Sequence, residues 1–147
     1  MREIKFFDYQ SLFVPYKKDL LNIFEDVASR GAFILQEDLR KFEKNKANYT
    51  GAKHAIGVGN ATDALQLLFN ANGLTKGDEV IFCSHTMIAT ASAIKFSGAT
   101  PIPVEAGIDH LIEIDSVKEA ITKNTKAIVP TQLNGRVANM DEIIKIA

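Results

Sequence analysis

Residues 55–68 read Ala-Ile-Gly-Val-Gly-Asn-Ala-Thr-Asp-Ala-Leu-Gln-Leu-Leu, and this stretch decides which fold the rest of the chain can adopt. Its pattern predicts a short apolar strand at 55–58, a tight polar turn, and a helix over 61–72. The first four N–H groups of a helix lack partners within the helix, and the helix dipole adds partial positive charge there. The turn therefore predicts an anion site, with phosphate as the expected ligand.

Three residues at the start of this helix carry the predicted site. Ala61 leaves the backbone open to a ligand, Thr62 adds a hydroxyl, and Asn60 directly precedes the helix. An Asn or Thr here is also typical of a helix cap, so a purely structural role is the alternative. Other segments of the sequence are needed to decide between a phosphate site and a capped helix start.

The composition predicts a globular domain with a real core. The chain has 147 residues, 46% of them hydrophobic, and its 17 basic and 18 acidic residues give a net charge of −1. We expect a cytoplasmic protein that binds neither nucleic acid nor a membrane. Cys83 is the only cysteine and lies in an apolar run, so we expect a buried structural thiol and no metal site.

The rest of the chain predicts helices followed by alternating strands and helices. An aromatic arm is expected at 1–15, and amphipathic helices at 16–31 and 36–49. Further strands are expected at 79–84, 100–104 and 126–131, and further helices at 86–96, 115–121 and from Met140 onward. Pro101 and Pro103 indicate that their strand is short or lies at a sheet edge. Strands separated by single helices favour a three-layer α/β/α fold with a mainly parallel sheet.

Ligands of such sheets bind at the carboxyl ends of the strands. This rule brings the loops 59–62, 84–86 and 132–136 together as one candidate site. We expect His85 either to face a ligand or to be a hydrogen-bonded structural histidine. Arg136 is a candidate for binding a phosphate or carboxylate, although an exposed loop arginine is the commoner case.

A dinucleotide-binding fold is a rival interpretation of the same turn. Residues 57–62 partly satisfy the pattern G-x-G-x-x-G/A, but Thr62 stands at the sixth position. The next strand, 80–84, ends without the acidic residue that would hold a ribose. The fingerprint is therefore weak support for a nicotinamide cofactor.

Five segments occur in a familiar order and spacing. They are Gly-Val-Gly-Asn-Ala-Thr-Asp-Ala-Leu (57–65), Gly-Asp-Glu-Val-Ile (77–81), Ser-His-Thr-Met-Ile-Ala-Thr-Ala (84–91), Ser-Gly-Ala-Thr-Pro-Ile-Pro-Val (97–104) and Thr-Lys-Ala-Ile-Val-Pro-Thr-Gln-Leu-Asn-Gly-Arg-Val-Ala-Asn-Met-Asp (125–141). From about Gly31 to its end, the chain resembles the N-terminal part of the DegT/DnrJ/EryC1/StrS family of pyridoxal-phosphate sugar aminotransferases.

The resemblance implies a partial large domain of the fold-type-I, aspartate-aminotransferase-like fold. It implies an N-terminal arm and helix at 1–30, a portion of the cofactor-binding domain at 31–147, and no C-terminal small domain. Members of the family are usually homodimers or other homo-oligomers. They transfer an amino group from glutamate to a nucleotide-linked keto-deoxysugar, in surface polysaccharide or aminosugar biosynthesis.

The resemblance also implies a partial site for pyridoxal 5'-phosphate. Ala61 and Thr62 would bind the cofactor phosphate and Met87 would stack on the pyridine ring. The place of Arg136 in the third loop, rather than the resemblance, makes it the expected substrate contact. Asn60, His85 and Gln132 complete the expected cofactor contacts. Two residues depart from the family: the position of Met87 is commonly aromatic, and that of Gln132 is often His, which unlike Gln can take a charge.

The family's catalytic lysine and the aspartate that pairs with the pyridine nitrogen lie beyond the matched segment. We therefore expect no catalytic residue in this polypeptide and no transamination by it alone. The exposed positions predicted for Lys95, Lys118, Lys123 and Lys126 do not suit a Schiff-base lysine. Three alternatives stay open: part of a dehydratase of the same family, a non-catalytic phosphate-binding module, or an assembly partner that docks through the arm and the helix at 16–29.

Overall fold

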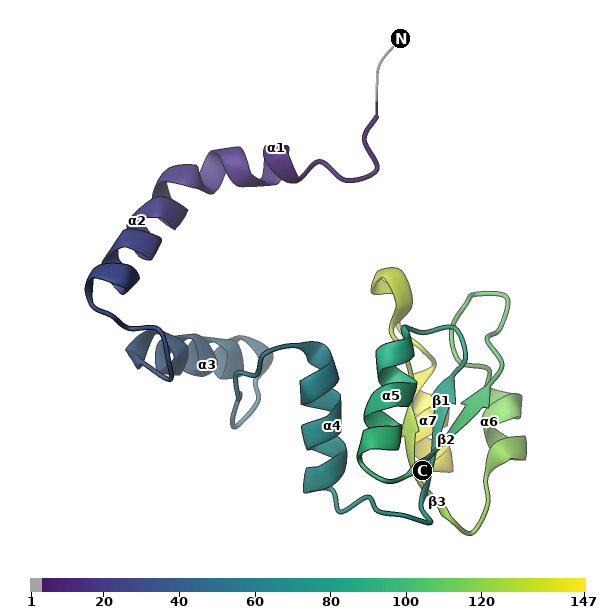
Figure 1. Cartoon of the computed structure of the whole chain (residues 1–147). Helices are drawn as coiled ribbons and strands as arrows, with labels where there is room; N and C mark the ends of the chain where they lie inside the picture. The colour runs from purple at the N-terminus through teal and green to yellow at the C-terminus, as the bar shows by residue number, and fades with distance from the viewer. Residues whose placement is uncertain (1–3) are drawn as a thin grey trace. The chain divides into compact units, whose positions relative to one another are not determined.

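The computed structural model describes residues 4–147, which form two compact units that meet between Gly57 and Val58. The division expected from the sequence, 1–30 and 31–147, stays a prediction, and its residues 1–3 lie outside the described part. The elements of the first unit are α1 (Tyr9–Phe13), the 3-10 helix η1 (Val14–Tyr16), α2 (Lys17–Ser29) and α3 (Glu37–Thr50) (Figure 1).

Helices α2 and α3 confirm the two predicted amphipathic helices, and residues 9–15 of the expected arm are helical as well, which the sequence pattern did not predict. Asp8 supplies a cap that the apolar pattern does not reveal, because its carboxylate accepts the backbone N–H of Ser11 at 3.2 Å. At the C-terminal end of α2, Arg30 donates to the carboxylates of Asp26 and Asp38 at 2.8 and 2.9 Å. The hydrogen bond from Arg30 holds the pKa of Asp38 below its usual value.

The second unit is built on a parallel sheet. Its elements are α4 (Ala61–Ala71), β1 (Glu79–Cys83), α5 (Ile88–Phe96), β2 (Thr100–Val104), α6 (Ile114–Ala120), β3 (Thr125–Val129), η2 (Leu133–Gly135) and α7 (Met140–Ile146). The strand order is β2-β1-β3, with Ile81 of β1 opposite Ile102 on one side and Ile128 on the other. Every strand predicted after residue 78 is therefore present.

The strand predicted at 55–58 is wrong. Residues 55–58 form no strand, because no other segment within residues 4–147 forms backbone hydrogen bonds with them. Instead, one of their amides bonds to a side chain, because Gly57 donates its N–H to the Glu43 carboxylate at 2.8 Å. An apolar run becomes a strand only where it finds a partner for its backbone, and Ile56 is correspondingly exposed.

Helices cover both faces of the sheet, which confirms the three-layer α/β/α architecture. On one face α4 and α5 lie side by side (Figure 1), and Phe69 and Ile94 pack with Val80 and Phe82 of β1. On the opposite face α6 and α7 contribute Val117 and Ile143, which pack with the other side of β1. Residues of β1 thus alternate between two cores.

Strand β2 lies at an edge, as its prolines predict. Thr100 donates its N–H to Asp78, and the Val104 carbonyl accepts the N–H of Ser84, so residues 100 and 104 bond toward β1. Alternation along the strand turns the nitrogens of Pro101 and Pro103 outward, where no N–H is needed.

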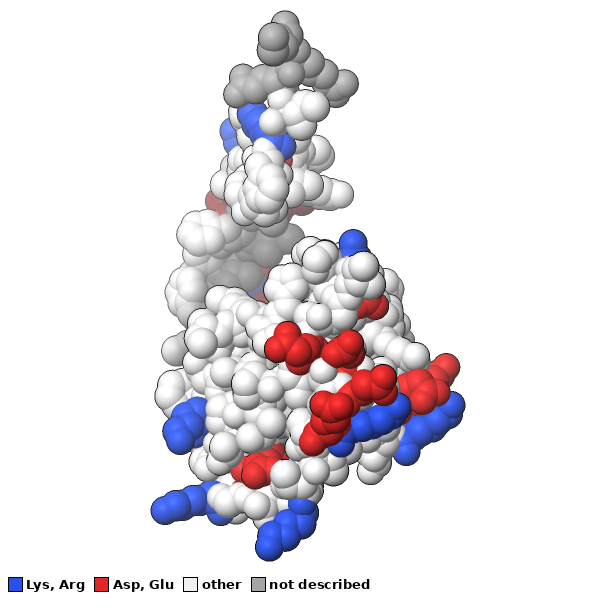
Figure 2. Space-filling model, turned by 90° about the vertical axis from the view of Figure 1, so that its right-hand side faces the viewer, with Lys and Arg blue, Asp and Glu red and all other residues white. Residues whose placement is uncertain are grey.

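The surface carries charges of both signs. On the face shown in Figure 2, acidic side chains gather in a band and basic ones lie beside and below it, so no broad basic area is visible there. Among residues 4–147, no helix has the length and apolarity that crossing a membrane requires.

Two isoleucines of α5 provide a matched test of this architecture. Ile94 is fully buried and Ile88 is 75% exposed. We expect Ile94→Ala to lower the free energy of unfolding by about 2–5 kcal/mol, because it removes buried apolar surface and leaves a cavity. Ile88→Ala should change it by no more than about 0.5 kcal/mol. Urea denaturation followed by circular dichroism measures both, and equal losses would contradict the packing described here.

Candidate functional site

The turn before α4 is closed by Asn60. Its backbone is extended, and its side-chain Oδ1 accepts the N–H of Asp63 at 3.0 Å. Its Nδ2 donates to the carboxylate of the same aspartate at 2.9 Å. The oxygen and the nitrogen of the Asn60 side-chain amide are thus both hydrogen-bonded to Asp63 in the first turn of α4, which supports the capping role. The contact with a cofactor expected of Asn60 stays a prediction.

The two residues after Asn60 leave donors free. In the described part of the chain, the backbone N–H groups of Ala61 and Thr62 have no acceptor, and the Thr62 hydroxyl makes no hydrogen bond. Helix α4 has 11 residues, enough for its dipole to add positive charge at this end. The start of α4 therefore presents two amides and a hydroxyl, which together suit an oxyanion.

Threonine hydroxyls join the second predicted loop to the segment that follows β3. Thr131 donates from Oγ1 to the Thr86 Oγ1 at 3.0 Å, and the hydroxyls of Thr86 and the buried Thr90 lie 3.0 Å apart. This chain of hydroxyls connects the ends of β1 and β3 to the first turn of α5. Sequence reasoning missed Thr90 and Thr131. The position of Thr131 directly after an apolar strand was the available signal.

Met87 and His85 lie on the loop between β1 and α5. Met87 occupies the N-cap position of α5 without a capping hydrogen bond, and the residue is 75% exposed, so its thioether is open to a ligand. The exposed ring of His85 packs edge-to-face against His110, with ring centroids 5.5 Å apart. His110 has a left-handed backbone with φ of 65°, which is uncommon outside glycine. The expected cofactor contacts of Met87 and His85 stay predictions.

Gln132 is tied into its own loop. Its Oε1 accepts the N–H of Ala138 at 2.6 Å, and its Nε2 donates to the Met140 sulfur at 3.4 Å. Between these residues the chain turns through left-handed backbone at Asn134 and Gly135. The geometry supports a role for Gln132 in shaping residues 133–138, and its contact with a cofactor stays a prediction.

Arg136 connects the third loop to the loop that follows β2. Its Nη1 donates to the backbone carbonyl of Asp109 at 2.6 Å. A guanidinium has five N–H donors, so this bond leaves others for an anionic ligand. The structure thus places Arg136 near the carboxyl ends of the strands, where a substrate role stays a prediction.

The three predicted loops occupy the same end of the sheet. A hydrogen bond joins Thr86 to Thr131, the residue directly before the third loop, whereas 59–62 reaches this end through the packing of α4 beside α5 (Figure 1). Cys83 is fully buried, which confirms the burial predicted for its thiol. Among the described residues, no group of three or more His, Cys, Asp and Glu side chains is placed to hold a metal. The four lysines excluded as Schiff-base candidates, Lys95, Lys118, Lys123 and Lys126, are all exposed.

Comparison with known proteins agrees with this geometry. The sequence profile of the DegT/DnrJ/EryC1/StrS aminotransferase family matches residues 16–147. The dTDP-3-amino-3,6-dideoxy-alpha-D-galactopyranose transaminase of Aneurinibacillus thermoaerophilus is 39% identical over 145 residues, which cover 98% of this chain and 40% of the relative.

Two solved structures superpose closely. DesV of S. venezuelae, crystallised with a ketimine intermediate, gives a TM-score of 0.94 at 36% identity and covers 100% of this chain and 40% of its own. NtdA of Bacillus subtilis with bound cofactor PMP gives a TM-score of 0.94 at 33% identity and covers 100% of this chain and 34% of its own. The chain thus spans about two fifths or less of the length of these proteins.

The role of Gln132 in its loop is testable at a single amide. We expect Gln132→Ala to speed hydrogen exchange at the Ala138 N–H by roughly 2- to 13-fold, because a net hydrogen bond of about 0.5–1.5 kcal/mol is lost. NMR-detected exchange measures this amide directly. The exposed Val137 offers a control in the same loop. Val137→Ala should leave the protection factor of the Ala138 amide unchanged, and a rate equal to wild type in Gln132→Ala would rule out the bond in solution.

Proposed function

This chain belongs to the DegT/DnrJ/EryC1/StrS aminotransferase family, and we propose that the start of its helix α4 binds the phosphate group of pyridoxal 5'-phosphate. The observation that carries the proposal is the set of free donors at Ala61 and Thr62. A phosphate dianion at this position would accept two backbone N–H bonds and one hydroxyl bond. Gly59 keeps the approach open because it adds no side chain.

The residues present fit the phosphate end of the cofactor better than its ring end. Met87 offers an exposed thioether for packing on the pyridine ring, and the hydroxyl chain through Thr86 fixes the loop that carries it. Pyridoxal phosphate supplies an electron sink that allows an amino group to be transferred. In this proposal the chain holds and orients pyridoxal phosphate through the phosphate of the cofactor.

For the whole protein we propose transfer of an amino group from glutamate to a nucleotide-linked keto-deoxysugar, in surface polysaccharide or aminosugar biosynthesis. The proposal is supported by relatives named as transaminases of dTDP-linked amino sugars and by one named as a UDP-linked 3-aminotransferase. Arg136 is the proposed substrate contact, since its remaining N–H groups suit a diphosphate or a carboxylate. We also propose a homodimer or other homo-oligomer, and a cytoplasmic location.

The Thr62 hydroxyl provides the test of the phosphate site. Thr62→Val keeps the side-chain shape and removes one charge-assisted hydrogen bond, which contributes about 1.5–3 kcal/mol. We expect the affinity for phosphate-bearing ligand to fall roughly ten- to a hundredfold. Calorimetry with pyridoxamine 5'-phosphate measures this, because that compound lacks the aldehyde that would react with surface lysines.

Thr100→Val is the matched control. Thr100 is exposed at the start of β2, at the opposite end of the strands from α4's first turn, and should bind the ligand like wild type. Unchanged affinity in Thr62→Val would show that the start of α4 is a helix cap and no ligand site.

A further inference from the structure

The chain contains two Asn-Gly pairs, Asn72–Gly73 and Asn134–Gly135. An asparagine before glycine can react with its own backbone, because the glycine nitrogen can attack the side-chain carbonyl carbon and form a succinimide ring as ammonia leaves. Glycine favours this step because it has no Cβ to obstruct the approach to its nitrogen. Since the dipeptide is the same in both places, any difference in reactivity between the two pairs reports the effect of the fold.

The turn that contains Asn134–Gly135 explains why this dipeptide stands there. Both residues have left-handed backbone, with φ of 52° and 77°. Asn and Gly adopt two successive positive φ values at the lowest cost. Both residues are exposed. The side-chain hydrogen bonds of this loop come from Gln132 and Arg136, and within residues 4–147 the Asn134 amide makes none. The carbonyl carbon that ring closure attacks is therefore open to solvent and unrestrained.

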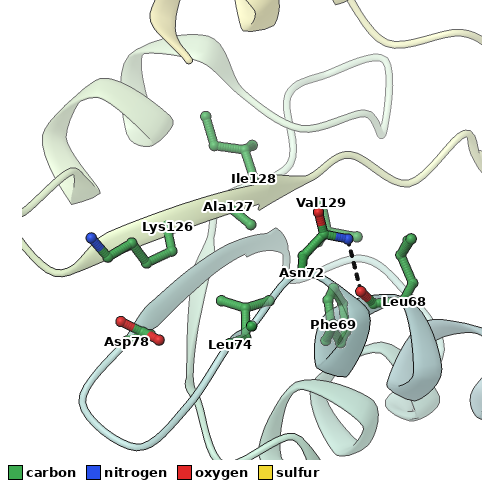
Figure 3. Close-up of a pocket in the computed structure, with 10 residues that line it drawn as sticks. Leu68, Phe69, Asn72, Leu74, Asp78, Lys126, Ala127, Ile128 and Val129 are labelled. Carbon is green, nitrogen blue, oxygen red and sulfur yellow. Dashed lines mark hydrogen bonds between the residues drawn. The ribbon is translucent and has the colours of Figure 1, made fainter.

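The pair Asn72–Gly73 is held at both of its reacting groups. Asn72 is the C-cap residue of α4, and its Nδ2 donates to the Leu68 carbonyl at 2.8 Å (Figure 3). The N–H of Gly73, whose nitrogen would have to attack, donates to the Asn70 carbonyl at 3.0 Å. Ring closure at Asn72 therefore requires both hydrogen bonds to break and the end of α4 to open.

The loop 133–138 controls the reactivity of the exposed pair. Asn134 has ψ of 36°, which turns the Gly135 nitrogen away from the Asn134 side chain. The backbone must rotate about this bond before the ring can close. Gln132 opposes the rotation, because its hydrogen bonds to Ala138 and Met140 span the loop. The rate of ring closure should then follow the population of the open loop.

We propose that Asn134 is a site of spontaneous deamidation in the folded chain, and that the hydrogen bonds of Gln132 limit its rate. A solvent base removes the proton of the Gly135 N–H, and the nitrogen bonds to Asn134 Cγ. The Cγ–Nδ2 bond breaks, and the nitrogen takes up a proton from solvent and leaves as ammonia. Water then opens the ring at either carbonyl carbon, which yields aspartate or isoaspartate. The reaction thus adds a carboxylate to the loop of Arg136, and it does not depend on phosphate binding at α4.

Peptide mapping of the incubated chain tests the proposal. Trypsin releases Asn134 in the peptide 127–136 and Asn72 in the peptide 54–76. The side-chain hydrogen bond of Asn72 alone should slow its reaction, so in mildly alkaline buffer we expect Asn134 to deamidate roughly 2- to 13-fold faster. Mass spectrometry measures both rates, and fragment ions identify the modified residue. Methylation by an isoaspartyl methyltransferase identifies the isoaspartate product.

Two variants and a denaturant separate the contributions of loop and sequence. Gln132→Ala should speed deamidation of Asn134 by roughly 2- to 13-fold, because the loss of a net hydrogen bond raises the population of the open loop. Val137→Ala changes an exposed residue of the same loop and should leave the rate as in wild type. In urea, where the fold is lost, Asn72 and Asn134 should react at similar rates because glycine follows both.

The proposal is wrong if Asn72 and Asn134 deamidate equally fast in the folded chain. It is also wrong if the ratio of the two rates is the same in urea as in buffer, since the sequence around each asparagine would then set the difference. An unchanged rate of Asn134 deamidation in Gln132→Ala would overturn the role assigned to the hydrogen bonds of Gln132.

Discussion

The second unit depends on the burial of β1 between two parallel neighbours and two helical layers. Val80, Ile81 and Cys83 have no exposed surface. Because the strands are parallel, each must be followed by a helix that returns the chain. Every loop that leaves a strand therefore lies at the same end of the sheet, at the carboxyl ends of the strands. The candidate site is a consequence of this rule: the threonine pair Thr86 and Thr131, 45 residues apart in sequence, meets at 3.0 Å there.

Features that depend on neighbouring residues could be predicted from the sequence. Helices α2 to α7, the strands after residue 78, the edge position of β2 and the free donors of Ala61 and Thr62 all follow from local pattern. The segment 55–58 was mispredicted because strand formation depends on a distant partner. Instead, the Glu43 side chain takes the N–H of Gly57. Helix α1 was missed because it depends on the single cap at Asp8 rather than on periodicity.

The candidate site divides in the same way. The free donors at the start of α4 belong to consecutive residues, so the spacing in the sequence was sufficient to predict them. The remainder depends on loops whose conformation the sequence does not reveal. Gln132 turns toward Ala138 and Met140 through left-handed backbone, and Arg136 reaches a carbonyl 27 residues away. The resemblance to the family implied a cofactor contact for Gln132, and loop position suggested an anionic ligand for Arg136, whereas the structure shows the hydrogen bonds that each makes within the chain.

The single thiol of the chain has a use that follows from its position. Cys83 ends the central strand with its side chain sealed in the core under α6 and α7. A thiol reagent reaches such a group only when the sheet opens, and the reaction rate then reports the population of the open form. Since the chain has one cysteine, the label reports on one place without mutation. The molecule therefore carries an intrinsic probe for the opening of its own centre, at the strand on which both helical layers rest.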